Sequence, residues 1–133
     1  MNWKTLMQDI PYQVIGEGNS EEITSIEYDS RKVRPGSAFV AVAGGAFDGH
    51  DFIAQAAEAG AVLAVVEKEI KEIPEGMCVV KVESTLAAMP RMAVRFYGRP
   101  SESMYMIGVT GTKGKTTTTP LIYRILMAAG RKT

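Results

Sequence analysis

The stretch SAFVAVAGGAFDGHDFIAQAAEAGAVLAVVE, residues 37–67, decides the fold. Residues 37–44 and 61–67 are short and almost continuously apolar, which is typical of strands that are buried on both faces. Between them, residues 48–60 carry apolar side chains at helical spacing, and Gly60 is placed to end a helix. A strand, a helix and a second strand in this order predict an α/β domain built around parallel strands.

The segments on either side extend this pattern. Residues 23–30 alternate apolar and polar side chains, as a half-buried strand does, and Pro35-Gly36 indicates a turn before the next strand. A further apolar strand is expected at 78–82. It contains Cys78, the only cysteine, which we expect to be a buried structural residue rather than a nucleophile.

Residues 83–98 predict a helix, because their apolar side chains recur on one face. Ser84 or Thr85 is placed to cap its first turn. Pro90 lies inside this segment, where proline removes a hydrogen bond and costs about 3 kcal/mol. The sequence therefore predicts a kink at Pro90 or a helix that begins later, close to that residue.

A linker rich in Gly, Pro and Ser, residues 98–103, indicates a domain boundary. We place one domain at residues 1–100 and the start of a second at 101–133. In the second part, residues 104–110 predict a strand and 115–130 predict a helix with an apolar stripe.

The composition excludes several function classes. Lysine and arginine balance aspartate and glutamate, 15 against 15, so charge gives no reason to expect nucleic acid or an anionic membrane as a partner. The N-terminus lacks the features of a signal peptide, and the apolar runs fall short of the roughly 20 residues that cross a bilayer. A single cysteine fits the reducing cytoplasm.

The segment GVTGTKGKTTTT, residues 108–119, has the composition of a phosphate-binding loop. Glycines let backbone N–H groups turn towards an anion, and the following helix N-terminus adds partial positive charge. Lys115 would reach the terminal phosphates and Thr116 would bind Mg²⁺. Val109 stands where the common P-loop spacing has its first glycine, so a glycine-rich turn with a charged cap remains an alternative.

Two further polar residues have simple structural interpretations. His50 is the only histidine, so it cannot form a histidine cluster for a metal, and we expect a surface role at the helix start. Arg31 is placed to pair with Asp29 or to cap a turn, rather than to contact a ligand.

Three blocks of the sequence resemble the Mur ligases. Residues 110–118, TGTKGKTTT, resemble their ATP loop, whose usual form is TGT-Asn-GKTT. Residues 28–44 and 47–67 are similar to the N-terminal, UDP-binding domain of the MurE type, and residues 95–112 resemble the junction that follows it. The resemblance implies a small mixed-sheet UDP-binding domain with flanking helices, followed by the first strand, phosphate loop and helix of a truncated ATPase domain.

The resemblance also implies two groups of site residues. The residues that fall where the family binds UDP are Tyr28, Ser30, Gly45, Ala46 and Phe47. The residues on the ATP loop are Gly111, Thr112, Lys113, Gly114, Lys115, Thr116 and Thr117, with Lys115 in the catalytic role and Thr116 as the Mg²⁺ ligand. Lys113 replaces the usual Asn and adds a cation to the loop. From the residues alone, Ser30 as a turn former and Gly45 as a turn glycine stay open.

The function implied is that of an ATP-dependent acid–amino-acid ligase in peptidoglycan synthesis. Such an enzyme adds the third residue, diaminopimelate or lysine, to UDP-N-acetylmuramoyl-dipeptide through an acyl phosphate. We expect a cytoplasmic enzyme, monomeric at full length, of which these 133 residues alone would be inactive. The alternatives are a MurF-like ligase, a non-catalytic UDP-sugar binding module, and a small P-loop phosphotransferase.

Overall fold

The computed structural model describes residues 1–19, 22–45, 47–103 and 106–131. It divides into two compact units, Met1–Pro100 and Ser101–Thr133, which are described separately. None of the helices in the described ranges has both the length and the apolar character needed to cross a bilayer.

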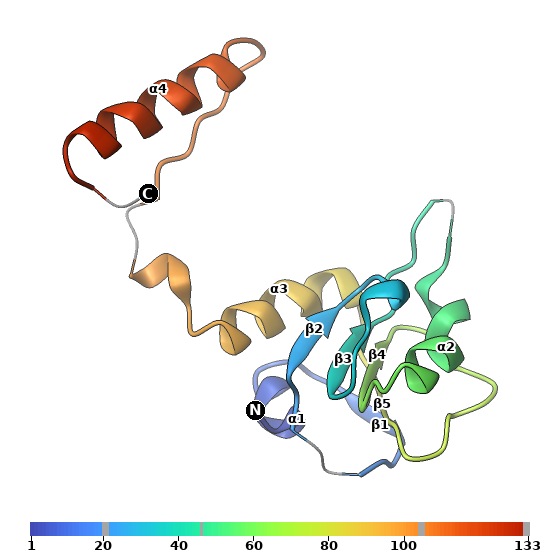
Figure 1. Ribbon diagram of the computed structural model, residues 1–133. Coiled ribbons are helices and arrows are strands. Elements are labelled where there is room, and N and C mark those ends of the chain that lie inside the picture. The colour runs from blue at the N-terminus through green and yellow to red at the C-terminus, as the bar shows by residue number, and fades with distance from the viewer. Residues whose placement is uncertain (20–21, 46, 104–105, 132–133) are drawn as a thin grey trace. The chain divides into compact units, whose positions relative to one another are not determined.

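A five-stranded mixed sheet forms the centre of the first unit (Figure 1). Its strands are β1 (Gln13–Gly16), β2 (Ser25–Glu27), β3 (Ser37–Val40), β4 (Leu63–Val66) and β5 (Cys78–Lys81). They lie in the order β1-β5-β4-β3-β2. Three of the pairings are parallel, and β1 pairs with β5 in the antiparallel sense. The predicted α/β fold with a mixed sheet is confirmed.

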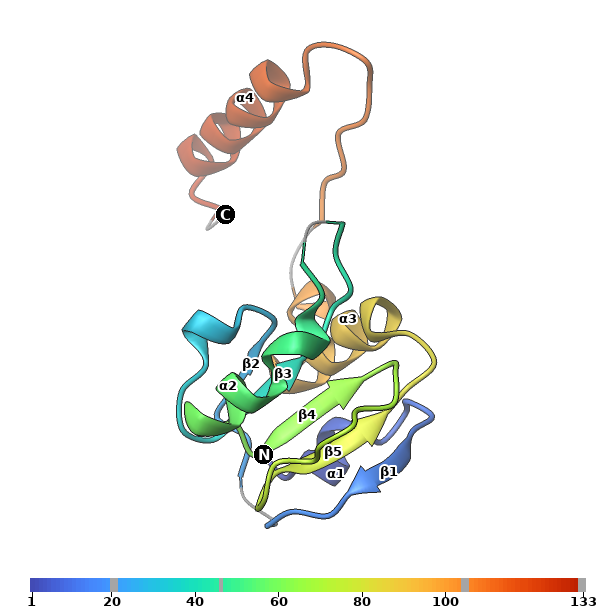
Figure 2. The same cartoon turned by 90° about the vertical axis from the view of Figure 1, so that its right-hand side faces the viewer.

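Helices cover both faces of this sheet (Figure 2). On one face α1 (Trp3–Leu6) and α3 (Thr85–Phe96) pack against alternate strand residues, including Val40, Leu63 and Val80. On the other face α2 (Ile53–Glu58) packs against the residues between them, including Phe39 and Ala64. Because successive side chains of a strand point to opposite faces, continuous apolar strands require cover on both sides.

The central strand–helix–strand unit follows the sequence pattern closely. The expected helix at 48–60 consists of a 3₁₀ turn, Gly49–Phe52, that leads into α2. Gly60 ends it with φ +95°, and a Cβ at this position would lie 2.8 Å from the Pro35 Cα. Gly60 is therefore required both by its backbone conformation and by the close approach of the preceding turn.

Of the two alternatives predicted for Pro90, a kink or a late start of the helix, the late start is wrong. The helix begins at Thr85, where the Ser84 side chain accepts a hydrogen bond from the Ala87 N–H, and it continues through Pro90. Pro90 is exposed, whereas Ala88 and Met92 are buried against the sheet. Burial of this apolar face and the N-terminal cap offset the single hydrogen bond that the proline removes.

Two elements at the N-terminus have no counterpart among the sequence predictions. Helix α1 spans only four residues, and β1 is a four-residue edge strand. Neither segment is long enough for its apolar residues to show the periodicity of a helix or a strand. Their positions come from tertiary packing, since Trp3, Leu6 and Met7 are buried in the core beneath α3. The expected burial of Cys78 is confirmed, and burial raises the pKa of its thiol.

The second unit contains a 3₁₀ turn, Pro100–Glu102, at the boundary and α4 (Lys115–Ala128). The strand predicted at 104–110 is not formed over 106–110, and residues 104 and 105 lie outside the described part of the chain. A parallel strand needs neighbouring strands for its hydrogen bonds, and no other strand is described in this unit. The apolar stripe of α4 is likewise uncovered, with Leu121 and Ile125 exposed.

Truncating a central core residue tests this architecture. Leu63 is fully buried in β4, so Leu63→Ala is expected to lower the free energy of unfolding by about 2–5 kcal/mol. Leu86 is 59% exposed on α3, and Leu86→Ala serves as the matched control, with a change within about 0.5 kcal/mol. Urea denaturation followed by circular dichroism measures both values. An equal decrease in the free energy of unfolding in the two variants would contradict the assignment of Leu63 to the core.

Candidate functional site

A pocket of about 590 Å³ lies beyond the carboxyl ends of β2 and β3. Ligand sites in α/β proteins gather at this end of the strands, because the loops that follow them leave a crevice there. The pocket is lined by Tyr28, Asp29, Ser30, Arg31, Phe39, Val42, Gly44, Phe47, Gly49, Phe52 and Gln55. Four of these side chains are aromatic, so the pocket presents flat apolar surface together with a few polar groups.

The structure brings together three of the five residues predicted to bind UDP. Tyr28 and Phe47 are 64% and 76% exposed, and both line the pocket with Ser30. Gly45 is not among the lining residues, whereas its neighbour Gly44 is. Ala46 lies outside the described residues.

Ser30 begins a 3₁₀ turn, Ser30–Lys32, directly after β2. Its hydroxyl donates a hydrogen bond of 3.0 Å to the side-chain oxygen of Gln55, which comes from α2. Sequence reasoning missed Gln55. The only sequence signal for Gln55 is that it is polar in a helix that otherwise carries mostly alanine. Its hydrogen-bond partner, Ser30, is 25 positions away in the chain. Together, Ser30 and Gln55 place hydroxyl and amide groups in the same wall of the pocket.

The predicted pairing of Arg31 with Asp29 is confirmed. The Arg31 guanidinium donates two hydrogen bonds, 2.9 and 2.8 Å long, to the two carboxylate oxygens of Asp29. This contact lowers the pKa of Asp29 to about 2. The Asp29 carboxylate also caps the 3₁₀ turn by accepting from the Arg31 backbone N–H. The pair holds the turn that presents Ser30 to the pocket.

Phe47 is carried by a loop whose two sides are joined by backbone contacts. The Gly49 N–H donates to the Val42 carbonyl at 2.9 Å, Ala43 forms a bridge with Asp48, and the Gly44 N–H donates to the Phe47 carbonyl at 3.0 Å. A Cβ on Gly49 would lie 2.7 Å from the Val42 nitrogen, so only glycine permits this approach. We refer to the described residues of this segment, 42–45 and 47–49, as the Phe47 loop.

The surface role predicted for His50 is wrong. Its side chain is only 7% exposed, and it lies within a chain of hydrogen bonds below the Phe47 loop. His50 Nδ1 lies 2.5 Å from Asp48 Oδ1, and His50 Nε2 accepts from the Glu67 N–H at the end of β4. The imidazole fills the space between the loop and the sheet, a contact that the spacing along the chain does not reveal.

The same hydrogen-bonded chain continues to α3. The Glu67 carboxylate accepts from both the N–H and the hydroxyl of Thr85, at 2.9 and 3.1 Å. At the other end, the Lys68 ammonium and then His50 lower the pKa of Asp48 well below its ordinary value. Four elements of the fold, namely the Phe47 loop, the following 3₁₀ turn, β4 and α3, are thus joined by polar contacts.

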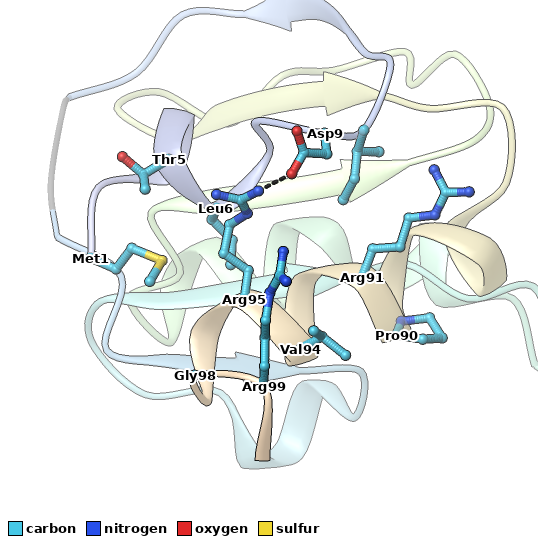
Figure 3. A pocket seen from close by; sticks show the side chains of 11 residues that line it. Met1, Thr5, Leu6, Asp9, Pro90, Arg91, Val94, Arg95, Gly98 and Arg99 are labelled. Carbon is cyan, nitrogen blue, oxygen red and sulfur yellow. Dashed lines mark hydrogen bonds and ion pairs between the residues drawn. The ribbon is translucent and has the colours of Figure 1, made fainter. Parts of the chain in front are cut away.

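A second pocket, of about 690 Å³, lies between α1 and α3 (Figure 3). Arg91, Arg95 and Arg99 line it, and Arg95 pairs with Asp9 and donates to Gln8. This pocket lies between the helices on the face opposite α2, away from the loops that follow β2 and β3. None of the predicted site residues lines it, so the pocket at the strand ends is the better candidate for a nucleotide.

The candidate phosphate loop belongs to the second unit. Gly114 precedes α4 with φ +83°, a conformation that suits glycine, and its carbonyl accepts from the N–H groups of Thr117 and Thr118. The Lys115 ammonium donates to the Gly111 carbonyl, so it closes the loop Gly111–Lys115 on itself. The loop therefore holds a cation and a helix N-terminus next to one another, the arrangement that suits a phosphate.

The threonines of α4 differ in what they bind. The hydroxyls of Thr118 and Thr119 donate to backbone carbonyls four residues earlier. The Thr116 hydroxyl has no such partner among the described residues and stays available as an oxygen ligand. No group of three or more His, Cys, Asp or Glu side chains suited to a metal occurs in the described ranges. Thr116 fits Mg²⁺ only as one ligand beside phosphate oxygens.

Comparison with known proteins assigns the family. Residues 22–97 match the family described as "Mur ligase family, catalytic domain", which is more than half of the chain. The chain belongs to the Mur ligase family. This Mur ligase chain is 43% identical to the UDP-N-acetylmuramoyl-L-alanyl-D-glutamate--2,6-diaminopimelate ligase of Geobacillus thermodenitrificans, over 99% of the chain and 26% of the relative. It is 49% identical to the enzyme of the same name from Geobacter sulfurreducens, over 84% of the chain and 22% of the relative.

Solved structures of the Mur ligase MurF share the fold. MurF from Acinetobacter baumannii matches with a TM-score of 0.75 and 29% identity, over 96% of this chain and 28% of that one. MurF from Thermotoga maritima, crystallised with ADP, matches with a TM-score of 0.62 and 34% identity, over 78% of this chain and 23% of that one. The Mur ligase chain described here spans about a quarter of the length of these relatives.

The ion pair between Asp29 and Arg31 predicts how the stability of the pocket wall depends on pH. In Arg31→Ala the pKa of Asp29 is expected to rise from about 2 towards its ordinary value of 3.8. Because the native pKa is the lower one, the stability from this pair is present above 3.8 and is lost as the pH falls through about 2.

Titration of the Asp29 carboxyl carbon by NMR measures this shift. Lys32→Ala is the matched control, because Lys32 contributes the smallest of the effects that lower the Asp29 pKa. An Asp29 pKa that stays near 2 in Arg31→Ala would show that the guanidinium is not its cause.

Proposed function

We propose that this chain is the UDP-substrate-binding part of a MurE-type ligase, which adds the third amino acid to UDP-N-acetylmuramoyl-L-Ala-D-Glu. The observation that carries the proposal is the gathering of Tyr28, Ser30 and Phe47 in one pocket at the strand ends. All three are among the residues that the family resemblance predicts to bind UDP. Relatives of 37–49% identity that carry the name of a diaminopimelate ligase support the MurE type.

The pocket has the chemistry that a uracil base requires. Uracil presents a flat ring and an edge that both donates and accepts hydrogen bonds. The exposed rings of Tyr28 and Phe47 offer stacking surfaces, and stacking of a base on an aromatic ring contributes about 1–3 kcal/mol. Ser30 and Gln55 each combine donor and acceptor groups, so they can match the base edge after giving up their mutual hydrogen bond.

The second unit would contribute the ATP end of the reaction. ATP with Mg²⁺ supplies the phosphoryl group that activates the substrate carboxylate for attack by an amine. In the proposed site, Lys115 leaves the Gly111 carbonyl to bind the terminal phosphates, and the N–H groups at the start of α4 bind phosphate oxygens. Thr116 would supply its hydroxyl oxygen as a Mg²⁺ ligand, and Gly111, Thr112, Lys113, Gly114 and Thr117 would form the rest of the loop.

The relatives' names favour diaminopimelate over lysine as the amino acid added. We also propose that the enzyme acts in the cytoplasm, which its nucleotide substrates and its single buried cysteine support, and that it is a monomer at full length.

A non-catalytic UDP-sugar binding module is the second candidate, and one observation favours it. The pocket is built entirely from residues of the first unit, which has its own core, whereas no described residue of α4 is buried. The first unit therefore contains every residue needed to bind UDP in this pocket, and binding there would not require ATP.

Calorimetry with UDP tests the proposed pocket. Phe47→Ala is expected to weaken binding about tenfold, which corresponds to about 1.4 kcal/mol, through loss of a stacking surface. Ser30→Ala is expected to weaken it to a similar extent by removing a hydrogen bond to the base. Leu86→Ala, on the exposed face of α3, is the control and is expected to bind as the native chain does. Native affinity in both pocket variants would exclude this pocket as the uridine site.

Binding of Mg-ATP tests the loop separately. Lys115→Ala is expected to lower ATP affinity about tenfold or more, because a charged contact to phosphate contributes at least 1.4 kcal/mol. Lys113→Ala is the matched control in the same loop and should have the smaller effect. Fluorescence titration with a labelled ATP analogue gives both affinities. A larger loss in Lys113→Ala would reverse the assigned roles of the two lysines.

A further inference from the structure

The His50 side chain lies close to the pocket and is only 7% exposed, yet it does not line the pocket. It also links the Phe47 loop to the end of β4, beside the pair of Asp48 with Lys68. On one side it contacts Asp48, which closes the loop opposite Ala43. On the other side it accepts a hydrogen bond of 3.1 Å from the Glu67 N–H at the end of β4.

The hydrogen bonds determine which tautomer the imidazole adopts. A backbone N–H can only donate, so Nε2 of His50 must be the unprotonated acceptor facing Glu67. Nδ1 then carries the proton and donates it to the Asp48 carboxylate. Asp48 also accepts from the His50 backbone N–H at 3.0 Å and pairs with Lys68. Both ring nitrogens therefore form hydrogen bonds: Nδ1 donates and Nε2 accepts.

The position of Phe47 depends on these contacts. Phe47 itself is 76% exposed, so little core packing holds its ring in place. Its loop is held by the backbone bonds at Gly44 and Gly49 and by the Asp48–His50 contact to the sheet. Beyond Glu67, the bonds from Thr85 extend the support to the start of α3. Thr85 is fully buried, so this end of the chain of hydrogen bonds is fixed within the core.

We propose that His50 is a positioning residue for substrate binding: it holds the Phe47 loop against the sheet so that Phe47 faces the uridine pocket. This inference rests on the proposed function for its ligand, uridine diphosphate, but its effect on the loop is independent of that ligand. Without the imidazole, Asp48 keeps its pair with Lys68 but loses the contact that runs through His50 to β4, and the Glu67 N–H loses its acceptor. The loop then samples other conformations, and the affinity falls in proportion to the population that remains competent.

Two measurements on the whole chain test this role. The first is the affinity for UDP by calorimetry. The second is hydrogen exchange at the Gly44 and Gly49 amides, which report the two bonds that close the loop. His50→Ala is expected to bind UDP about tenfold more weakly, as when the competent loop falls to about a tenth of the population. Exchange at both amides is expected to accelerate by more than this factor, because exchange follows the open population, which rises from a small fraction to most of the molecules.

Two further variants separate positioning from general stability. In His50→Gln the side-chain oxygen can accept from the Glu67 N–H, so both readouts are expected to return towards native values. Arg95→Ala removes the pair with Asp9 between α3 and the segment after α1, away from the loop. It is expected to lower the melting temperature while UDP affinity and the exchange of Gly44 and Gly49 stay native.

The outcomes distinguish the two proposals. Native UDP affinity and native exchange in His50→Ala would overturn the positioning role, as would an equal loss of UDP affinity in Arg95→Ala. Failure of the unaltered chain to bind UDP would contradict the proposed function instead. In that case accelerated exchange at Gly44 and Gly49 in His50→Ala still supports the positioning role, and unchanged exchange still overturns it.

Discussion

Burial of β3, β4 and β5 on both faces is the constraint on which the rest of the first unit depends. These strands carry apolar side chains at nearly every position, and the sheet separates two cores. Burial on both sides requires α2 on one face and α1 with α3 on the other. The parallel pairing that follows brings the carboxyl ends of β2, β3 and β4 to one edge. The pocket exists because the loops after these strands meet at that edge.

Polar groups at this edge have two separate tasks. Tyr28, Ser30, Phe47 and Gln55 face the pocket and offer contacts to a ligand. His50 and Thr85 lie behind it, and their hydrogen bonds run from the Phe47 loop to α3. A largely exposed ring such as Phe47 cannot be held by packing, so its placement must come from backbone and polar contacts in the supporting loop.

The second unit lacks the constraint that orders the first. Its loop and α4 have suitable local signals, since Gly114 adopts a positive φ and Lys115 begins the helix. However, no strand is described in this unit beside residues 106–110, and Leu121 and Ile125 of the apolar stripe of α4 are exposed. The loop Gly111–Lys115 therefore takes its local shape although no strand is described beside it in this unit, because turns depend on near neighbours and sheets do not.

The sequence by itself determined the features that depend on near neighbours. These are the apolar strands and their crossover helix, the cap at Ser84, the turn glycine Gly60, the Asp29–Arg31 pair and the glycine loop before α4. The tertiary structure alone decided contacts between distant residues, such as Ser30 with Gln55 and His50 with Glu67, and it placed the edge strand β1. It also decided that α3 runs through Pro90 and that no strand forms at 106–110. The physical reason is range: propensity, capping and turn geometry act over a few residues, whereas burial and sheet hydrogen bonds depend on segments that only the fold brings together.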